Sequence, residues 1–146
     1  MKDFDRPLNK RGLKDAELIG KFLGTKKIHP DLLISSPAER ARQTVDLVLK
    51  SSSLQVELRF DERIYEASVT RLFEVISQIE DTVEAVVLVG HNPGFAELLH
   101  GLTGEMRDFS TAGLACVELS IEKWGKVRPS VGHVKWFVAP KDLRHD

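Results

Sequence analysis

The stretch LLISSPAERA at residues 32–41 decides the fold class. It opens with three apolar residues that Pro30 precedes and a Ser-Ser-Pro turn follows, a pattern typical of a short buried strand. Pro37 suits the first position of a helix, and the apolar residues after it recur at helical spacing as far as Leu49. The stretch therefore predicts a strand that leads through a polar turn directly into a helix.

Similar units follow along the chain. The run AVVLV at residues 85–89 is continuous and rich in β-branched residues, which is typical of a strand covered on both faces. Strands that alternate with helices predict an α/β fold, a three-layer sandwich with a mostly parallel central sheet, in one domain spanning residues 1–146. Besides the elements above, we expect helices at 13–23 (capped by Asn9), 69–79 and 95–99, and strands at 56–60, 114–121 and 131–138.

The composition argues against several classes of protein. Lysine and arginine number 21 and aspartate and glutamate 22 in 146 residues, so the net charge of -1 argues against nucleic-acid binding by bulk charge. The longest apolar run, at 85–89, is far too short for a membrane span, and residues 1–5 carry no apolar signal segment. The single cysteine, Cys116, cannot form an internal disulfide or make a metal site alone. We therefore expect a cytoplasmic protein with no metal, membrane or nucleic-acid partner.

Two segments follow predicted parallel strands, at the edge where α/β sheets bind ligands. Arg40 lies about one turn into the helix after residues 35–37, where free N–H groups and a guanidinium fork can hold an anion. His91 comes directly after 85–89 and can act as an acid, a base, a nucleophile or an anion partner. Taken alone, each also has an ordinary interpretation, Arg40 as a surface arginine and His91 as a structural histidine.

Two other segments give weaker signals. Pro7 restricts Arg6 to extended backbone and so gives the arginine a defined direction. Glu66 or Glu62 can serve as a general acid if the loop at 61–66 folds over the site, although acidic residues are common on surfaces. The sequence contains no Gly-x-Ser-x-Gly elbow, Walker loop or Gly-x-Gly-x-x-Gly, so a serine hydrolase, a nucleoside triphosphatase and a dinucleotide enzyme have no support.

Four segments taken in order carry a more specific signal than any one of them. They are DRPLN at 5–9 followed by Arg11-Gly12, SPAERARQT at 36–44, VGHNPG at 89–94 and STAGLA at 110–115. Together they resemble the SixA-type phosphohistidine phosphatases of the histidine phosphatase superfamily, which also contains the phosphoglycerate mutases. The resemblance runs through nearly the whole chain.

The resemblance implies a phosphate pocket without a metal or other cofactor. In it Arg6, Arg40 and His91 bind phosphate, Arg40 and His91 take part in catalysis, and Asn92 orients the loop or donates to the ligand. Two arginines and an imidazolium around a dianion would stabilise the charge that accumulates during transfer. SixA-type members lack the general acid of the mutases, and Glu66 is the candidate for that role here. The implied reaction removes phosphate from a histidine-phosphorylated signalling protein, such as a phosphotransfer domain.

The sequence departs from the family pattern at its start. Family members begin with a strand ending in Arg-His-Gly or Arg-His-Ala, whose histidine becomes phosphorylated, and a loop separates it from the Arg-Pro-Leu segment. Here Met1 lies four residues before Asp5, and the first histidine is His29. We therefore expect the nucleophile and its strand to have no place in these 146 residues, which makes their activity doubtful. We also expect strands with unpaired backbone groups where that strand would pair.

Three functions remain open at this point. The first is a phosphohistidine phosphatase that acts on a protein. The second is a non-catalytic module that binds phosphoproteins and would lose binding on Arg40→Ala. The third is a phosphatase of the same superfamily for a small phosphoester, which the short chain disfavours because it leaves an open and shallow pocket.

Overall fold

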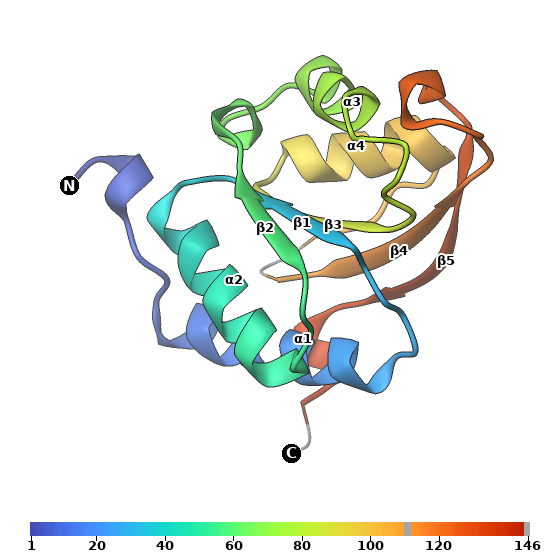
Figure 1. Cartoon of the computed structure of the whole chain (residues 1–146). Coiled ribbons are helices and arrows are strands. Elements are labelled where there is room, and N and C mark those ends of the chain that lie inside the picture. The colour runs from blue at the N-terminus through green and yellow to red at the C-terminus, as the bar shows by residue number, and fades with distance from the viewer. Residues whose placement is uncertain (110–111, 145–146) are drawn as a thin grey trace.

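The computed structural model describes residues 1–109 and 112–144. The chain alternates helices and strands, as the sequence predicts, with short 3-10 turns between them (Figure 1). The helices are α1 (Lys10–Thr25), α2 (Glu39–Ser52), α3 (Val69–Ser77) and α4 (Gly94–Thr103). The strands are β1 (Leu32–Ser35), β2 (Glu57–Phe60), β3 (Val86–Val89), β4 (Leu114–Leu119) and β5 (Gly132–Val138), and the 3-10 turns are η1 (Asp3–Asp5), η2 (Glu62–Ile64), η3 (Trp124–Lys126) and η4 (Pro140–Asp142).

A three-stranded parallel sheet forms the middle layer, in the order β2-β1-β3. Leu33 of β1 stands opposite Leu58 of β2 and Val87 of β3. Helices α1 and α2 lie on one side of the strands and α3 and α4 on the other (Figure 1). All four residues of β1 are buried because strands cover both of its edges and helices both of its faces. The α/β class and the parallel sheet are thus confirmed.

Helices α1 and α2, which cover one face of the sheet, pack closely against each other. Asn9 caps α1 as predicted, since its side-chain oxygen accepts a hydrogen bond from the Gly12 N–H at 2.8 Å. A Cβ atom on Gly20 would come within 2.7 Å of the Ser51 side chain, so only glycine permits this approach of α1 to α2. Helix α2 begins at Glu39 rather than at Pro37, because Pro37 stays in a turn whose Ser36 hydroxyl accepts from the Ala38 N–H.

Strands β4 and β5 form a separate antiparallel pair. The Asn92 side chain, after the end of β3, donates to the Phe109 carbonyl, ahead of β4. Beyond the end of β4, the Trp124 indole donates at 2.8 Å to the Val83 carbonyl, just before β3. Strand β4 therefore runs in the opposite direction to β3. The three-stranded sheet is parallel throughout, and the β4–β5 pair is antiparallel.

An apolar cavity of about 630 Å³ lies between β3 and β4, and we call it the β3–β4 slot. In the part of the chain that the structure describes, no hydrogen bond joins the two strands. The Val89 carbonyl accepts from the Ser36 N–H, so by the alternation along a strand Val86 and Leu88 turn their backbone groups toward the slot. Side chains from both helix layers also line it, among them Leu23, Phe95, Leu98 and Leu102.

The slot corrects one expectation from the sequence. The run at 85–89 predicts a strand covered on both faces, yet every residue of β3 is only half-buried. The physical reason is that β3 is hydrogen-bonded along one edge only, while the other edge faces the cavity. The sequence analysis expects unpaired backbone groups where the family's first strand would pair, and the structure has such groups along the open edge of β3.

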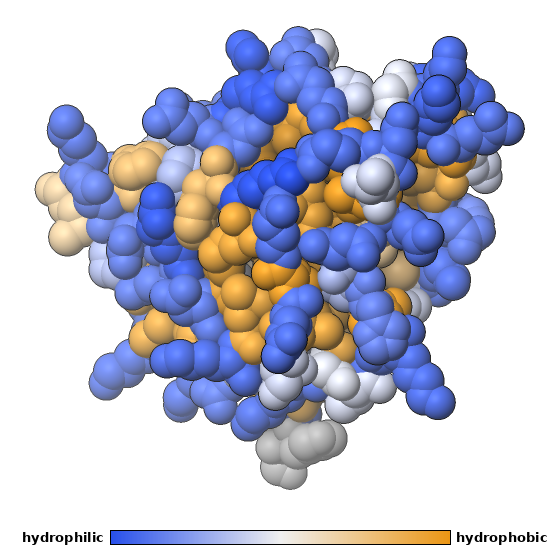
Figure 2. Space-filling model, viewed as in Figure 1, coloured by the Kyte–Doolittle hydropathy of each residue, from blue (hydrophilic) through white to orange (hydrophobic). Residues whose placement is uncertain are grey.

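The surface is mixed. Apolar side chains gather at the centre of the face seen in Figure 1, and hydrophilic ones surround them (Figure 2). Exposed large apolar side chains include Leu58 and Phe60 of β2 and Phe4 of η1. No helix in residues 1–109 and 112–144 is long and apolar enough to cross a membrane.

Candidate functional site

The candidate site lies at the carboxyl ends of β1 and β3, where parallel sheets bind ligands. Ser36 directly follows β1, and its N–H donates at 2.9 Å to the carbonyl of Val89, the last residue of β3. His91 follows β3, and its Nε2 lies 2.7 Å from the Ser36 hydroxyl oxygen. Because Ser36 is fully buried, this contact fixes the imidazole at the sheet edge.

The His91 imidazole is neutral at neutral pH. Its pKa falls from 6.5 to about 4, mainly because the ring is buried and in part because of the positive charge of Arg40, against a smaller opposing effect of Asp3. This differs from the imidazolium that the sequence analysis expects, because the ring is desolvated beside an arginine. A neutral imidazole can accept a proton or attack an electrophile, which an imidazolium cannot.

The side chains of Arg6 and Arg40 both donate hydrogen bonds to the Asp3 carboxylate. Arg40, on the first turn of α2, donates from Nη1 to the Asp3 carbonyl at 2.9 Å and from Nη2 to Asp3 Oδ2 at 3.2 Å. Arg6 donates from Nη2 to Asp3 Oδ1 at 2.8 Å. The Tyr65 hydroxyl donates to Asp3 Oδ2 at 2.6 Å. The site is therefore built to hold an anion, and Asp3 shows where the anion lies.

The surroundings of Asp3 favour its charged form. The hydrogen bond from Tyr65 lowers the pKa of the Asp3 carboxyl most, and the charges of Arg40 and Arg6 lower it further. Two of the three side chains that hold Asp3 are the arginines expected to bind phosphate. The Tyr65 ring lies edge-on to the His91 ring, with centroids 5.6 Å apart, and so links the anion to the imidazole.

Of the other predicted site residues, Asn92 lies outside this cluster, whereas the Glu66 carboxylate lies near the Tyr65 hydroxyl and contributes to the raised pKa of Tyr65. The Asn92 amide donates to the Phe109 carbonyl, so it orients the loop after β3 and does not point to Asp3. Glu66 is exposed, in the left-handed backbone region at φ 53°. Of the motif at 110–115, Ser110 and Thr111 lie outside the described residues.

Three residues of the cluster were not singled out from the sequence. Tyr65 falls in the loop at 61–66, Ser36 in the motif at 36–44 and Asp3 in the segment at 1–5, and none of the three is a candidate on its own. Ser36 had a signal, because it directly follows a predicted buried strand and precedes a helix. Asp3 and Tyr65 had none, because they are 62 residues apart and only the tertiary structure brings them together.

The residue types at the site point to the chemistry of an anionic group. Guanidinium forks and a phenol stabilise negative charge on oxygen, and a neutral imidazole stands beside them. Among residues 1–109 and 112–144, no three His, Cys, Asp or Glu side chains gather in a way that could hold a metal ion. The fold and this cluster define an α/β protein with two arginines, a tyrosine and a neutral histidine around a carboxylate at the carboxyl edge of its parallel sheet.

The sequence comparisons identify the family. Residues 2–85 match the family described as Histidine phosphatase superfamily (branch 1), and the chain belongs to it. An uncharacterised protein of Mycobacterium tuberculosis is 30% identical over 150 residues, which span 95% of this chain and 92% of that protein. An uncharacterised chloroplastic protein of Arabidopsis thaliana is 27% identical over 157 residues, which span 96% of this chain and 70% of that protein.

Solved structures of SixA proteins share the fold. The SixA protein of Agrobacterium tumefaciens, assigned as a phosphohistidine phosphatase, superposes with a TM-score of 0.82 at 28% identity, covering 96% of this chain and 87% of that one. The protein histidine phosphatase SixA complexed with tungstate superposes with a TM-score of 0.84 at 23% identity, covering 98% of this chain and 90% of that one. The chain is thus a SixA-like member of the histidine phosphatase superfamily.

Proposed function

We propose that this protein is a metal-independent phosphohistidine phosphatase that removes phosphate from a histidine-phosphorylated protein. The observation that carries the proposal is the Asp3 carboxylate, which Arg6, Arg40 and Tyr65 hold at the carboxyl edge of the sheet. A phosphoryl group presents the same kind of oxygen atoms to the same donors. Arg40 and Arg6 would stabilise the charge on these oxygens during transfer.

The proposed reaction has two steps. A nucleophilic imidazole forms a bond to phosphorus while the bond from phosphorus to the substrate histidine breaks, and the leaving imidazole takes a proton from solvent. Water then attacks the phosphorus of the phosphorylated enzyme histidine, the phosphorus–nitrogen bond breaks, and inorganic phosphate leaves while a proton from the water restores the imidazole. The neutral His91 would stand beside the transferred group and exchange hydrogen bonds with its oxygens.

The nucleophilic histidine of this reaction is inferred from the resemblance to the family. In the family it ends a strand, and a strand parallel to β3 in the β3–β4 slot would end next to His91. The slot has unpaired backbone groups along β3 and apolar side chains on both faces, which suit an apolar strand. We propose that filling the slot with such a strand completes both the sheet and the catalytic site.

An exposed site favours a protein substrate over a small one. The side chain of Asp3 is 42% exposed and that of Arg40 is 24% exposed, so the anion lies near the surface. A phosphohistidine on another protein can reach such a site without being enclosed. A small sugar phosphate would leave most of its surface in water.

Phosphate release from a histidine-phosphorylated phosphotransfer domain tests the proposal. The 146-residue chain is compared with the same chain extended by a strand ending in Arg-His-Gly. We expect hydrolysis by the extended chain and its loss in Arg40→Ala, whereas Arg71→Ala, which removes an exposed arginine that pairs with Glu74 and not with Asp3, serves as the control. No hydrolysis by the extended chain would contradict the proposal, and saturable Arg40-dependent binding without hydrolysis would favour a binding module.

A small-molecule substrate forms the second arm of that assay. A sugar phosphate is offered to the same proteins at the same concentration. We expect the phosphorylated protein to give the higher kcat/KM. The opposite order would favour the small-phosphoester phosphatase.

A further inference from the structure

Tyr65 sits at the centre of the anion site, although nothing in its local sequence marks it. It ends the turn η2, so its place in the loop before α3 is set by the Asp61 side chain, which accepts from the Arg63 N–H and starts that turn. Its ring lies between two others, edge-on to Phe4 at 5.2 Å and to His91 at 5.6 Å between centroids. This packing on two sides holds the ring and aims the hydroxyl.

The hydroxyl shares one oxygen atom with an arginine. Asp3 Oδ2 receives the Tyr65 hydroxyl at 2.6 Å and Arg40 Nη2 at 3.2 Å, while Oδ1 receives Arg6 at 2.8 Å. The Tyr65 contact is the shortest of the three. It is also the one that bridges the anion and the ring that packs on His91.

We propose that the Tyr65 hydroxyl is a substrate-contacting residue, which donates to a phosphoryl oxygen when phosphate takes the place of the Asp3 carboxylate. The Asp3 carboxylate is then an internal occupant of the site, held by the same three donors in the free protein. This inference rests on the proposed function only in taking the ligand to be a phosphoryl group. It names a residue and a competition that the family resemblance does not assign.

The chemistry of a phenol suits this role. The hydrogen bond to Asp3 raises the pKa of Tyr65 to about 12, with smaller contributions from burial and from the Asp3 charge. The hydroxyl therefore keeps its proton and stays a donor through the neutral and mildly alkaline range. A phosphate dianion in place of the carboxylate carries more charge and would hold the proton on the phenol in the same way.

Competition between Asp3 and phosphate has a measurable consequence. Removing the Tyr65 hydroxyl weakens the binding of phosphate, but it also weakens the binding of the competing Asp3 carboxylate. In the unmodified protein these two effects partly cancel in the apparent Kd. Asp3→Asn keeps the shape of the side chain and removes its charge, so in that background the loss of the hydroxyl acts on phosphate alone.

Calorimetric binding of inorganic phosphate at pH 7.5 tests the inference on four proteins: the unmodified chain, Asp3→Asn, Tyr65→Phe and the double variant. We expect Asp3→Asn to tighten phosphate binding by about fivefold or more. We expect Tyr65→Phe to weaken it by about tenfold in the Asp3→Asn background and by less in the unmodified chain, because hydrogen bonds to charged groups are the stronger ones. Phenylalanine keeps both ring contacts, so the packing on His91 is preserved.

Two results would overturn the inference. Equal phosphate affinity of Asp3→Asn and the double variant would show that the hydroxyl does not contact phosphate. Unchanged or weaker binding in Asp3→Asn would show that the carboxylate is not a competitor. Thermal unfolding of each variant confirms that it is folded. Arg71→Ala, which removes an exposed arginine that pairs with Glu74 on α3, serves as the control and should bind phosphate as the unmodified chain does. Because the readout is binding, it is separate from phosphohistidine hydrolysis, so the two proposals can fail independently.

Discussion

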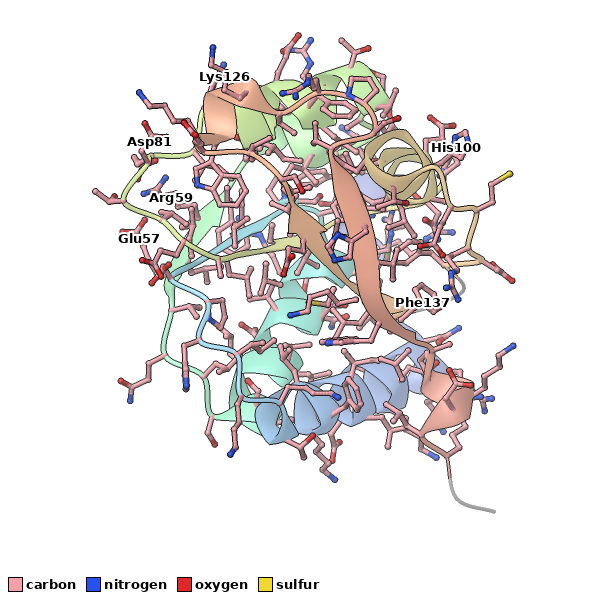
Figure 3. The ribbon with its side chains drawn as sticks, turned by 90° about the vertical axis from the view of Figure 1, so that its right-hand side faces the viewer. Glu57, Arg59, Asp81, His100, Lys126 and Phe137 are labelled. Carbon is pink, nitrogen blue, oxygen red and sulfur yellow. The ribbon has the colours of Figure 1, made fainter. Side chains whose placement is uncertain are left out.

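The two edges of the three-stranded sheet differ in chemistry. Strand β2, at the outer edge, carries Glu57 and Arg59 (Figure 3). The Arg59 guanidinium donates to Glu57 and, through two nitrogens, to Glu80. The outer edge of β3 carries no charge and faces the apolar β3–β4 slot. Charged side chains on an edge strand discourage further strands from pairing, whereas an apolar edge invites one. Strand β2 therefore ends the sheet, whereas β3 has the residues of an interior strand.

Amide hydrogen exchange gives the largest expected contrast. The β1 amides of Leu33 and Ile34 are hydrogen-bonded within the sheet, whereas the Leu88 amide points into the slot. We expect Leu88 to exchange about a thousandfold faster than Ile34, because β1 amides exchange only on wide unfolding. Equal rates would show that the edge of β3 is paired in solution. In the chain extended by a strand, the Leu88 rate should fall.

Matched leucine truncations come next in size. Leu33→Ala in buried β1 should lower the free energy of unfolding by about 3 kcal/mol, through lost burial and the cavity left behind. Leu88→Ala in half-buried β3 should cost about half of that, since its neighbourhood already contains the slot. Urea unfolding of both variants measures the difference. A cost for Leu88→Ala equal to that of Leu33→Ala would mean that the slot is filled or collapsed.

His91, which follows the carboxyl end of β3, makes the stability of the protein depend on pH. The folded-state pKa of His91 is about 4 and its ordinary value is 6.5, so between these values the unfolded chain binds the extra proton. Stability therefore falls as the pH falls from about 6.5 toward about 4. After allowance for the partial exposure of the ring, we expect His91 to account for about 1 kcal/mol.

Comparison with His91→Gln isolates this contribution. The glutamine variant lacks the titrating ring, so its stability should change less between pH 7 and pH 4.5. Urea unfolding at the two pH values provides the measurement. The same slope in both proteins would assign the acid sensitivity to other groups.

The charged residues at the outer edge of β2 give the smallest expected effect. Hydrogen bonds from Arg59 lower the pKa of Glu80 to about 2. In Arg59→Ala, the Glu80 titration should return toward 4.5 while the unfolding midpoint changes little, because exposed ion pairs contribute little to stability. Carboxyl carbon chemical shifts followed by NMR from pH 2 to 6 check this. Arg71→Ala is the control and should leave the Glu80 titration unchanged.

Part of the candidate site could be predicted from sequence, because strand ends mark the ligand edge. His91 directly follows a predicted strand, and Arg40 lies one turn into the helix that follows another, so both can be assigned to this edge from the sequence. The charge of His91 could not be predicted, since it depends on burial and on the approach of Arg40 from another element. Tyr65 was missed for a similar reason, because its partners Asp3 and His91 come from distant parts of the chain.

The order of helices and strands, the parallel sheet and the cap at Asn9 follow from the sequence alone, because periodicity and capping are local properties of the backbone. The start of α2 at Glu39, the open edge of β3 and the place of Asp3 between the arginines depend on tertiary contacts. These features depend on which segments come to lie side by side. The same apolar run at 85–89 is compatible with a covered strand or an open one, and only its neighbours in space distinguish the two.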